Sequence, residues 1–453
     1  MKKISLLTLG MATAISCQSV AADNLVEIFN QALDHDPVLQ ASAANVMSVA
    51  EGITQNRAPL LPQLNGRITR QLSDFAVEGE ISPGVPSDPF DSKGRTRTWT
   101  IQLQQELFDW RTWKALSQAE LRATQAEVNH GAELQNLIIK VAQRYFDVLF
   151  AEDSLEFAGA EKDAFQKELE QSRQRYDVGL IAVTDVYNAQ ANYDQAVARE
   201  ITAKNSLDNA YEALREVTGT YHYDLLELQD ELPLARPQPE NLDDWVRVAQ
   251  EQNLALRARM LDVDIAREEI KRRRAGHYPT ANLFANYTDQ EQFTQRMFDN
   301  PLSPSGTTNN LNEGASLTFQ VDVPIFSGLR TSSEVDQAQY DFQRASYQLE
   351  EIYRATQRNT RSAYLGIDSS IGSVKAFRQS EASSASALEA TEAGYEVGTR
   401  TIVDVLNSTR ALYQAKQNLA RARYDYVLNT LRLKQAAGIL TDEDLLIVNT
   451  WLR

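Results

Sequence analysis

The four histidines are the residues of this 453-residue chain best suited to acid–base catalysis or metal binding. An imidazole titrates near neutral pH and is a common metal ligand, so a cluster of histidines would indicate a catalytic or metal site. The four lie far apart in the sequence without metal-ligand spacing, at His35, His130, His222 and His277. A glycine-rich phosphate loop and a nucleophile elbow are also missing from the sequence. The sequence therefore predicts neither an enzyme nor a cofactor site.

A second set of reactive side chains lies in two similar segments, Tyr176–Asn188 and Tyr395–Asn407, which are 219 positions apart. Six of their thirteen positions are identical, among them a tyrosine, a glycine and an aspartate. Other segments keep nearly the same offset, such as RAPLLPQL from Arg57 and RAGHYPTANL from Arg274. Such a duplication predicts one structural unit that occurs twice. We place the two repeats at residues 23–235 and 236–453.

The first 22 residues have the three-part form of a secretory signal. Two lysines precede an apolar stretch from Ile4 to Ile15, and a small-residue cleavage site precedes Asp23. Cys17 is the only cysteine and would leave with this signal peptide, so the exported chain would contain no disulfide. In an alternative interpretation, Cys17 is the lipid-bearing first residue of the mature protein.

The charge of the chain argues against nucleic acid as a partner. The net charge is −17, and loss of the two lysines of the signal would change it to −19. After the signal, no apolar run approaches the roughly 20 residues that a membrane helix needs. Any contact with a bilayer must therefore use another kind of segment.

The distribution of proline predicts two pairs of long helices. Proline is absent between Pro89 and Pro233 and again after Pro324, and a helix interior excludes proline. A coiled-coil seam with steps of four and three residues runs through Leu134, Ile138, Val141, Tyr145 and Val148. We expect long helices at 109–176 and 327–395; a bundle with undetected breaks is the alternative. Each helix should turn back once, at Gly179 or Gly398, where a left-handed residue follows a helix end, and return toward Gly219 or Gly438.

Near the other end of each hairpin, the apolar period changes from helical to two, which is typical of strands with one apolar and one polar face. We expect four strands, at about 63–72, 99–108, 281–287 and 315–326. The proline-containing segments between them, 73–98 and 288–313, are expected to be irregular loops.

These strands have two possible settings. In a soluble sheet the apolar face would cover a core, but no other segment remains to pack against it. In a membrane, four strands leave unpaired edges that lipid cannot satisfy, so several copies must close a barrel. Two copies would give eight strands with a filled interior, and three would give twelve with space for a pore. The predicted fold is mainly α-helical with a membrane β-barrel.

The chain resembles the TolC family of outer-membrane channel proteins over nearly all of its mature length. The most specific runs are QRYDVGLIAVTDVYNAQANYDQA, AGYEVGTRTIVDVLNSTRALYQA and YDYVLNTLRLKQAAGIL. The resemblance implies a homotrimer with a twelve-stranded outer-membrane barrel and a twelve-helix periplasmic tunnel. It also implies passive export of small molecules or proteins, in multidrug efflux or type I secretion. Its partners would be a periplasmic adaptor, an inner-membrane pump of the RND, ABC or MFS class, and outer-membrane lipid.

The same resemblance implies a lock at the hairpin ends. Tyr395 would form a hydrogen bond with Asp185 of the same subunit, and Arg400 would reach Thr184 and Asp185 of the neighbour. Gln174 belongs to the same set of links. A few such links near water contribute about 1 kcal/mol each, weak enough for a docking partner to break.

Two further groups of residues follow from the resemblance. The adaptor would contact the turns, made of Val178, Gly179, Leu180, Val397, Gly398 and Thr399. Family members can carry two acidic residues at the narrowest point, and here the pair is Asp404 and Asn407. Their spacing places both side chains on one helix face, so a trimer would present one ring of carboxylates and one neutral ring.

Two alternatives remain open. The Lys271–Arg274 run is most simply a solvated helix face, and contact with lipid headgroups is a second possible role. The whole chain could instead be a periplasmic coiled-coil scaffold or adaptor that never crosses the membrane. The alternating strands argue against the scaffold, which has no use for a continuous apolar face.

Overall fold

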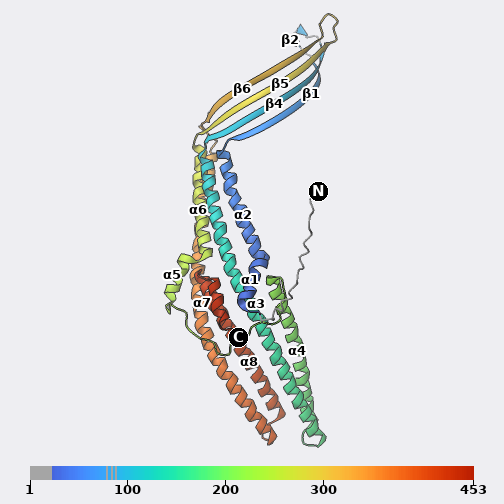
Figure 1. Cartoon of the computed structure of the whole chain (residues 1–453), viewed down its shortest axis with the longest axis vertical. Coiled ribbons are helices and arrows are strands. Elements are labelled where there is room, and N and C mark those ends of the chain that lie inside the picture. The colour runs from blue at the N-terminus through green and yellow to red at the C-terminus, as the bar shows by residue number, and fades with distance from the viewer. Residues whose placement is uncertain (1–22, 78–79, 83–84, 87–88) are drawn as a thin grey trace, which may run out of the picture. The chain divides into compact units, whose positions relative to one another are not determined.

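The computed structural model describes residues 23–453, apart from 78–79, 83–84 and 87–88 (Figure 1). The predicted signal peptide, with Cys17, lies outside the described residues. The helices are α1 Leu25–His35, α2 Pro37–Arg57, α3 Trp110–Asp177, α4 Val183–Thr218, α5 Leu242–Gln252, α6 Leu254–Arg274, α7 Arg330–Glu396, α8 Ile402–Ala437 and α9 Asp442–Asn449. The strands are β1 Gln63–Val77, β2 Glu80–Ser82, β3 Val85–Pro86, β4 Phe90–Phe108, β5 Thr280–Phe298 and β6 Gly306–Asp322.

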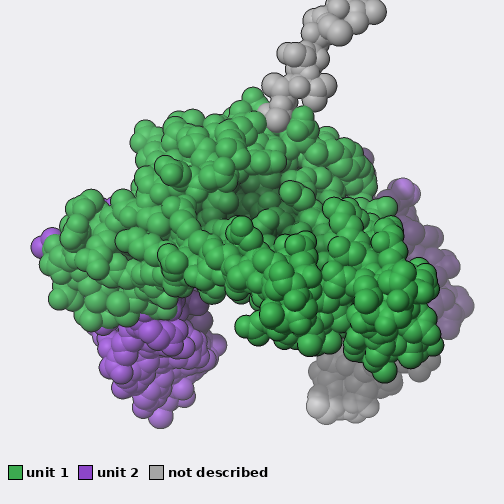
Figure 2. Space-filling model, turned by 90° about the horizontal axis from the view of Figure 1, so that it is seen from below, with its two compact units in different colours: residues 1–40, 134–245, 360–453 green, residues 41–133, 246–359 purple. Residues whose placement is uncertain are grey.

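The order of the larger elements occurs twice along the chain. Two helices, two long strands and two long helices follow one another as α1, α2, β1, β4, α3, α4 and again as α5, α6, β5, β6, α7, α8. The two compact units are not these repeats, because each unit takes segments from both. Of the described residues, unit 1 contains 23–40, 134–245 and 360–453, and unit 2 contains those within 41–133 and 246–359 (green and purple in Figure 2).

Unit 1 is helical, with a core between α3 and α8. Ile138, Val141, Tyr145 and Val148 of the predicted seam are at most 1% exposed, whereas Leu134 is 37% exposed. On α8, Tyr424 and Leu431 are buried, and the ring of Tyr424 lies 5.6 Å from that of Phe146. The predicted long helices are confirmed as continuous elements of 68 and 67 residues. None of the helices in the described part of the chain combines the length and apolar character needed to cross a membrane.

Unit 2 contains an open antiparallel sheet with the strand order β1-β4-β5-β6. In two adjacent rows, its register lines up side chains of one kind across all four strands. One row is apolar and consists of Leu64, Leu103, Ala285 and Leu317. The next row is polar and consists of Asn65, Gln102, Asn286 and Ser316. The apolar rows are not covered within the unit, since Leu64 and Leu317 are about 70% exposed (69% and 72%).

The predicted strand cores are confirmed, but two expectations about their ends were wrong. Much of the supposed loops is strand, because β1 and β5 continue to Val77 and Phe298, and β4 and β6 begin at Phe90 and Gly306. The last strand ends at Asp322 rather than near residue 326. Pro324 lacks the N–H that a ladder requires, which accounts for this early end.

Candidate functional site: the two hairpin tips

The two repeated segments form the turns of the helical hairpins, as predicted; we call residues 174–188 the first tip and 393–407 the second tip. Gly179 and Gly398 follow α3 and α7 with φ of 78° and 77°, the left-handed conformation that glycine adopts without strain. In the first tip, the N–H groups of Gly179 and Leu180 donate to the carbonyls of Tyr176 and Arg175, each at 2.8 Å. The second tip repeats this helix-ending pattern. The far helix ends also match, with Gly219 and Gly438 as left-handed caps.

Apolar side chains at both turns face solvent in the single chain. Val178, Leu180 and Val397 are 71%, 73% and 76% exposed, while Thr399 donates a hydrogen bond to the carbonyl of Gly394 at 3.0 Å. Burying such side chains is favourable by roughly 1.5–3 kcal/mol each, so the turns are suited to contact another protein.

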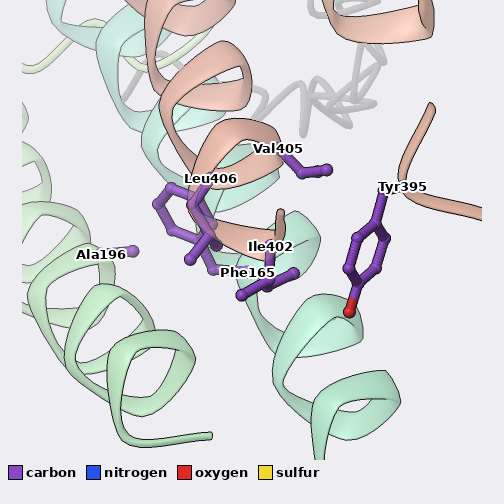
Figure 3. Close-up of a cluster of buried hydrophobic side chains, with 6 residues drawn as sticks. All are labelled: Phe165, Ala196, Tyr395, Ile402, Val405 and Leu406. Atoms are coloured by element: carbon purple, nitrogen blue, oxygen red, sulfur yellow. The ribbon is translucent and has the colours of Figure 1, made fainter. Parts of the chain in front are cut away.

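Tyr395 has a different environment from the one expected. Its ring is 6% exposed and belongs to the tip cluster, which consists of Phe165, Ala196, Tyr395, Ile402, Val405 and Leu406 (Figure 3). The guanidinium of Arg175 lies 4.2 Å from the centre of the ring, within the range of a cation–π contact. The Tyr395 hydroxyl is buried and has no hydrogen-bond partner among the described residues. The expected hydrogen bond to Asp185 is therefore wrong for this structure, because packing and Arg175 hold the ring instead.

The other predicted lock residues are not joined within the chain. Thr184, Arg400 and Gln174 are exposed and Asp185 is half-buried, and none of the four side chains forms a hydrogen bond or ion pair among the described residues. Their groups are therefore free to meet a second copy. The predicted roles of these residues stay predictions.

The two repeat-related aspartates, Asp185 and Asp404, differ in their partners. A carboxylate oxygen of Asp404 accepts hydrogen bonds from the N–H and the hydroxyl of Thr401, both at 2.9 Å, which caps α8. These backbone and side-chain hydrogen bonds lower the pKa of Asp404. In the first repeat Ala182 stands where Thr401 stands in the second, so α4 has no side-chain cap and the carboxylate of Asp185 is left without this partner. Asn407 lies one turn beyond Asp404 and is exposed.

Three side chains at or beside the tips were missed by the sequence analysis: Arg175 in the first tip, Glu168 just before it and Glu392 just before the second tip. One carboxylate oxygen of Glu168 is buried and finds no hydrogen-bond partner in the part of the chain that the structure describes. Burial and the nearby charge of Glu392 raise the pKa of Glu168, while Arg175 lowers it. Arg175 directly precedes the first repeated segment, but Gly394 occupies the corresponding position of the second, so the comparison of repeats gave no signal for it.

Glu168→Gln is expected to stabilise the first tip at neutral pH. Because the folded state raises the pKa of Glu168, the folded state holds its proton more tightly than the unfolded state. The stability of the tip should therefore fall as pH rises from about 4.5 through the raised pKa. Hydrogen exchange of residues 165–180, corrected for intrinsic rates, should show this loss in the wild type and little of it in the glutamine variant. Glu170→Gln, two residues away and exposed, is the control; an equal change in both variants would contradict the role of Glu168.

A family profile described as outer membrane efflux protein matches residues 28–220 and 245–439, one segment in each repeat. The chain belongs to this family. Outer membrane protein TolC of Vibrio cholerae serotype O1 is 40% identical over 100% of this chain and 99% of the relative. Alkaline protease secretion protein AprF of Pseudomonas aeruginosa is 28% identical over 94% of this chain and 86% of the relative.

The likeness to solved structures agrees with the fold of this outer membrane efflux protein. The Campylobacter jejuni CmeC outer membrane channel superposes with a TM-score of 0.73 at 13% sequence identity, covering 100% of this chain and 98% of that structure. At this identity the likeness concerns the fold alone. The family assignment and the TolC relative place the chain in the outer membrane as an efflux channel protein.

Proposed function

We propose that three copies of this outer membrane efflux protein close a twelve-stranded barrel in the outer membrane and a helical tunnel in the periplasm. The observation that carries the proposal is the open sheet with exposed apolar rows. Strands β1 and β6 each have one edge without a partner strand among the described residues. An unpaired edge is costly in lipid, and pairing β6 of one copy with β1 of the next removes it.

In this assembly the two hairpin tips form the closed entrance of the tunnel. Arg400 of one copy would meet Thr184 and Asp185 of the next. In support of this lock, none of the three side chains forms a hydrogen bond or an ion pair within the described residues. The exposed apolar turns would bind a periplasmic adaptor that connects the channel to an RND, ABC or MFS pump. The name of the AprF relative supports a role in protease secretion, and the family description supports efflux.

The trimer is tested by its mass in detergent and by cross-linking the strand edges. The only cysteine of the sequence lies in the predicted signal peptide, so introduced cysteines react alone. Ser316→Cys in β6, combined in turn with single cysteines placed along β1, should give covalent trimers with a bismaleimide for the β1 position that the barrel's stagger brings opposite it. The control pair Gln102→Cys and Asn286→Cys, opposite each other in β4 and β5, should join only within one chain. A folded monomer in micelles, or no cross-link between chains, would contradict the trimer.

A further inference from the structure

Two arginines occupy the same position in the two repeats, at the junction between helix and strand. Arg57 is the last residue of α2, and Arg274 is the last residue of α6. A three-residue 3-10 turn follows each of them, and each lies six residues before the first residue of a long strand. Both belong to unit 2, so one compact unit holds both junctions.

The cationic side chains next to Arg57 and Arg274 form ion pairs within the described part of the chain, unlike these two arginines. Lys271 pairs with Glu268 at 2.6 Å, and Arg272 and Arg273 each pair with Glu269 at 2.7 Å. Burial opposes the charge on Glu269, yet the hydrogen bonds from the two arginines outweigh it and hold its pKa at about 2. On α3, Arg111 pairs with Asp109 and Lys114 with Glu268.

By contrast, the side chains of Arg57 and Arg274 are exposed and form no ion pair or hydrogen bond within the described residues. A cation at a helix C-terminus also interacts favourably with the helix dipole, by about 0.3–1 kcal/mol. The interaction with the helix dipole does not occupy the N–H groups of the guanidinium. Each arginine can therefore still bind an anion with two N–H groups.

Large exposed apolar side chains surround the same junctions. Four residues after each arginine come Leu61 and Tyr278, both exposed. Where β4 and β6 lead into α3 and α7, a second exposed set consists of Leu107, Phe108, Trp110, Trp113, Ile325 and Phe326. Tryptophan and tyrosine favour the boundary between hydrocarbon and headgroups, where one end of the ring is apolar and the other meets water.

We propose that Arg57 and Arg274 bind the phosphate groups of anionic phospholipids in the leaflet on the helical side of the sheet. This inference rests on the proposed function, because that function places the apolar rows of the sheet in the membrane. The arginines would then lie at headgroup level, immediately outside the apolar rows, in a chain whose overall negative charge otherwise repels anionic lipid. In the trimer, six guanidinium groups would surround the base of the barrel and fix its depth.

The test measures lipid binding by the purified wild-type protein in nanodiscs of phosphatidylcholine that contain increasing fractions of phosphatidylglycerol. Lipids retained by the protein are counted by native mass spectrometry. Each arginine near the surface should strengthen binding of the anionic lipid about fivefold. Arg57→Gln and Arg274→Gln should each lose about this factor, and the double variant about 25-fold. Lysine at both positions should restore most of the binding, because it keeps the charge.

Arg122→Gln is the matched control, since Arg122 is also exposed on a helix of unit 2 and has no ionic partner among the described residues. Equal retention by the double glutamine variant and the wild type, or an equal loss in the Arg122 variant, would overturn the inference. Displacement of the lipid by free glycerol phosphate would overturn it as well, because the site would then bind phosphate without a bilayer. Conductance of the wild type in phosphatidylcholine bilayers tests the proposed channel separately: a conducting protein without lipid preference refutes only the lipid site.

Discussion

Tyr395→Ala is expected to open the channel entrance several-fold in planar bilayers, whereas Tyr395→Phe is expected to leave its conductance nearly unchanged. The Tyr395 ring is buried in the tip cluster and lies under the guanidinium of Arg175, but its hydroxyl has no hydrogen-bond partner within the described residues. Removing a buried aromatic ring costs roughly 3–5 kcal/mol, and the trimer would lose this packing three times. Removing an unpaired buried hydroxyl costs little.

This pair of variants separates two explanations of the lock. If a hydrogen bond from Tyr395 to Asp185 closed the entrance, phenylalanine would open it nearly as well as alanine. If packing closes it, only alanine opens it, and Arg175→Ala should have an intermediate effect because it removes only the cation–π contact, which contributes about 1 kcal/mol. A strong increase in conductance with Tyr395→Phe would contradict the packing explanation. The trimer mass of each variant checks that assembly is intact.

Arg400 should act independently of the Tyr395 hydroxyl. Arg400→Ser removes the group proposed to reach the neighbouring subunit, so it should raise conductance by itself. The double variant with Tyr395→Phe should then conduct like Arg400→Ser alone. This follows because Tyr395→Phe alone is expected to leave the conductance nearly unchanged.

The sequence predicted the parts of the fold whose signals are local. Glycine just beyond a helix end gives a left-handed cap, and this signal correctly placed both tips at Gly179 and Gly398. Alternation likewise located the strands wherever one face is apolar. The alternation did not predict the first part of β6, from Gly306 to Gly314. Polar side chains occur on both faces of the strand there, so apolar and polar residues do not alternate in the sequence. Register with β5 alone holds that segment in the sheet.

The tip site was harder to predict because its contacts join distant helices. No pattern in the sequence indicates that Arg175, at the end of α3, lies over the ring of Tyr395, at the end of α7. The resemblance indicated which residues form the lock, but not which contacts these residues make within a single chain. The sequence shows that the two repeats differ at this position, with Thr401 in one and Ala182 in the other. Only the structure shows the consequence: the Asp404 carboxylate accepts hydrogen bonds from Thr401, whereas the Asp185 carboxylate has no such partner and can contact a neighbouring subunit.

Asp404→Asn is expected to remove most of the block of the channel by multivalent cations. In the proposed trimer, three Asp404 carboxylates would form one ring at the constriction, and rings of carboxylates bind cations in narrow pores. The hydrogen bonds from Thr401 lower the pKa of this group in the single chain, which favours its charged form. Asn407→Asp should strengthen the block, because it adds a second ring one helical turn away.

The capping contact of Asp404 makes a further control necessary. Its carboxylate also caps α8, so loss of block could follow from fraying of the helix rather than from loss of charge. Thr401→Val removes the hydroxyl of the cap and keeps the charge, at a cost of about 1 kcal/mol to the helix end. If charge controls the block, Thr401→Val should block like the wild type while Asp404→Asn does not. Equal loss of block in both variants would assign Asp404 to the helix cap, and the selectivity of the channel would then be set at another level of the tunnel.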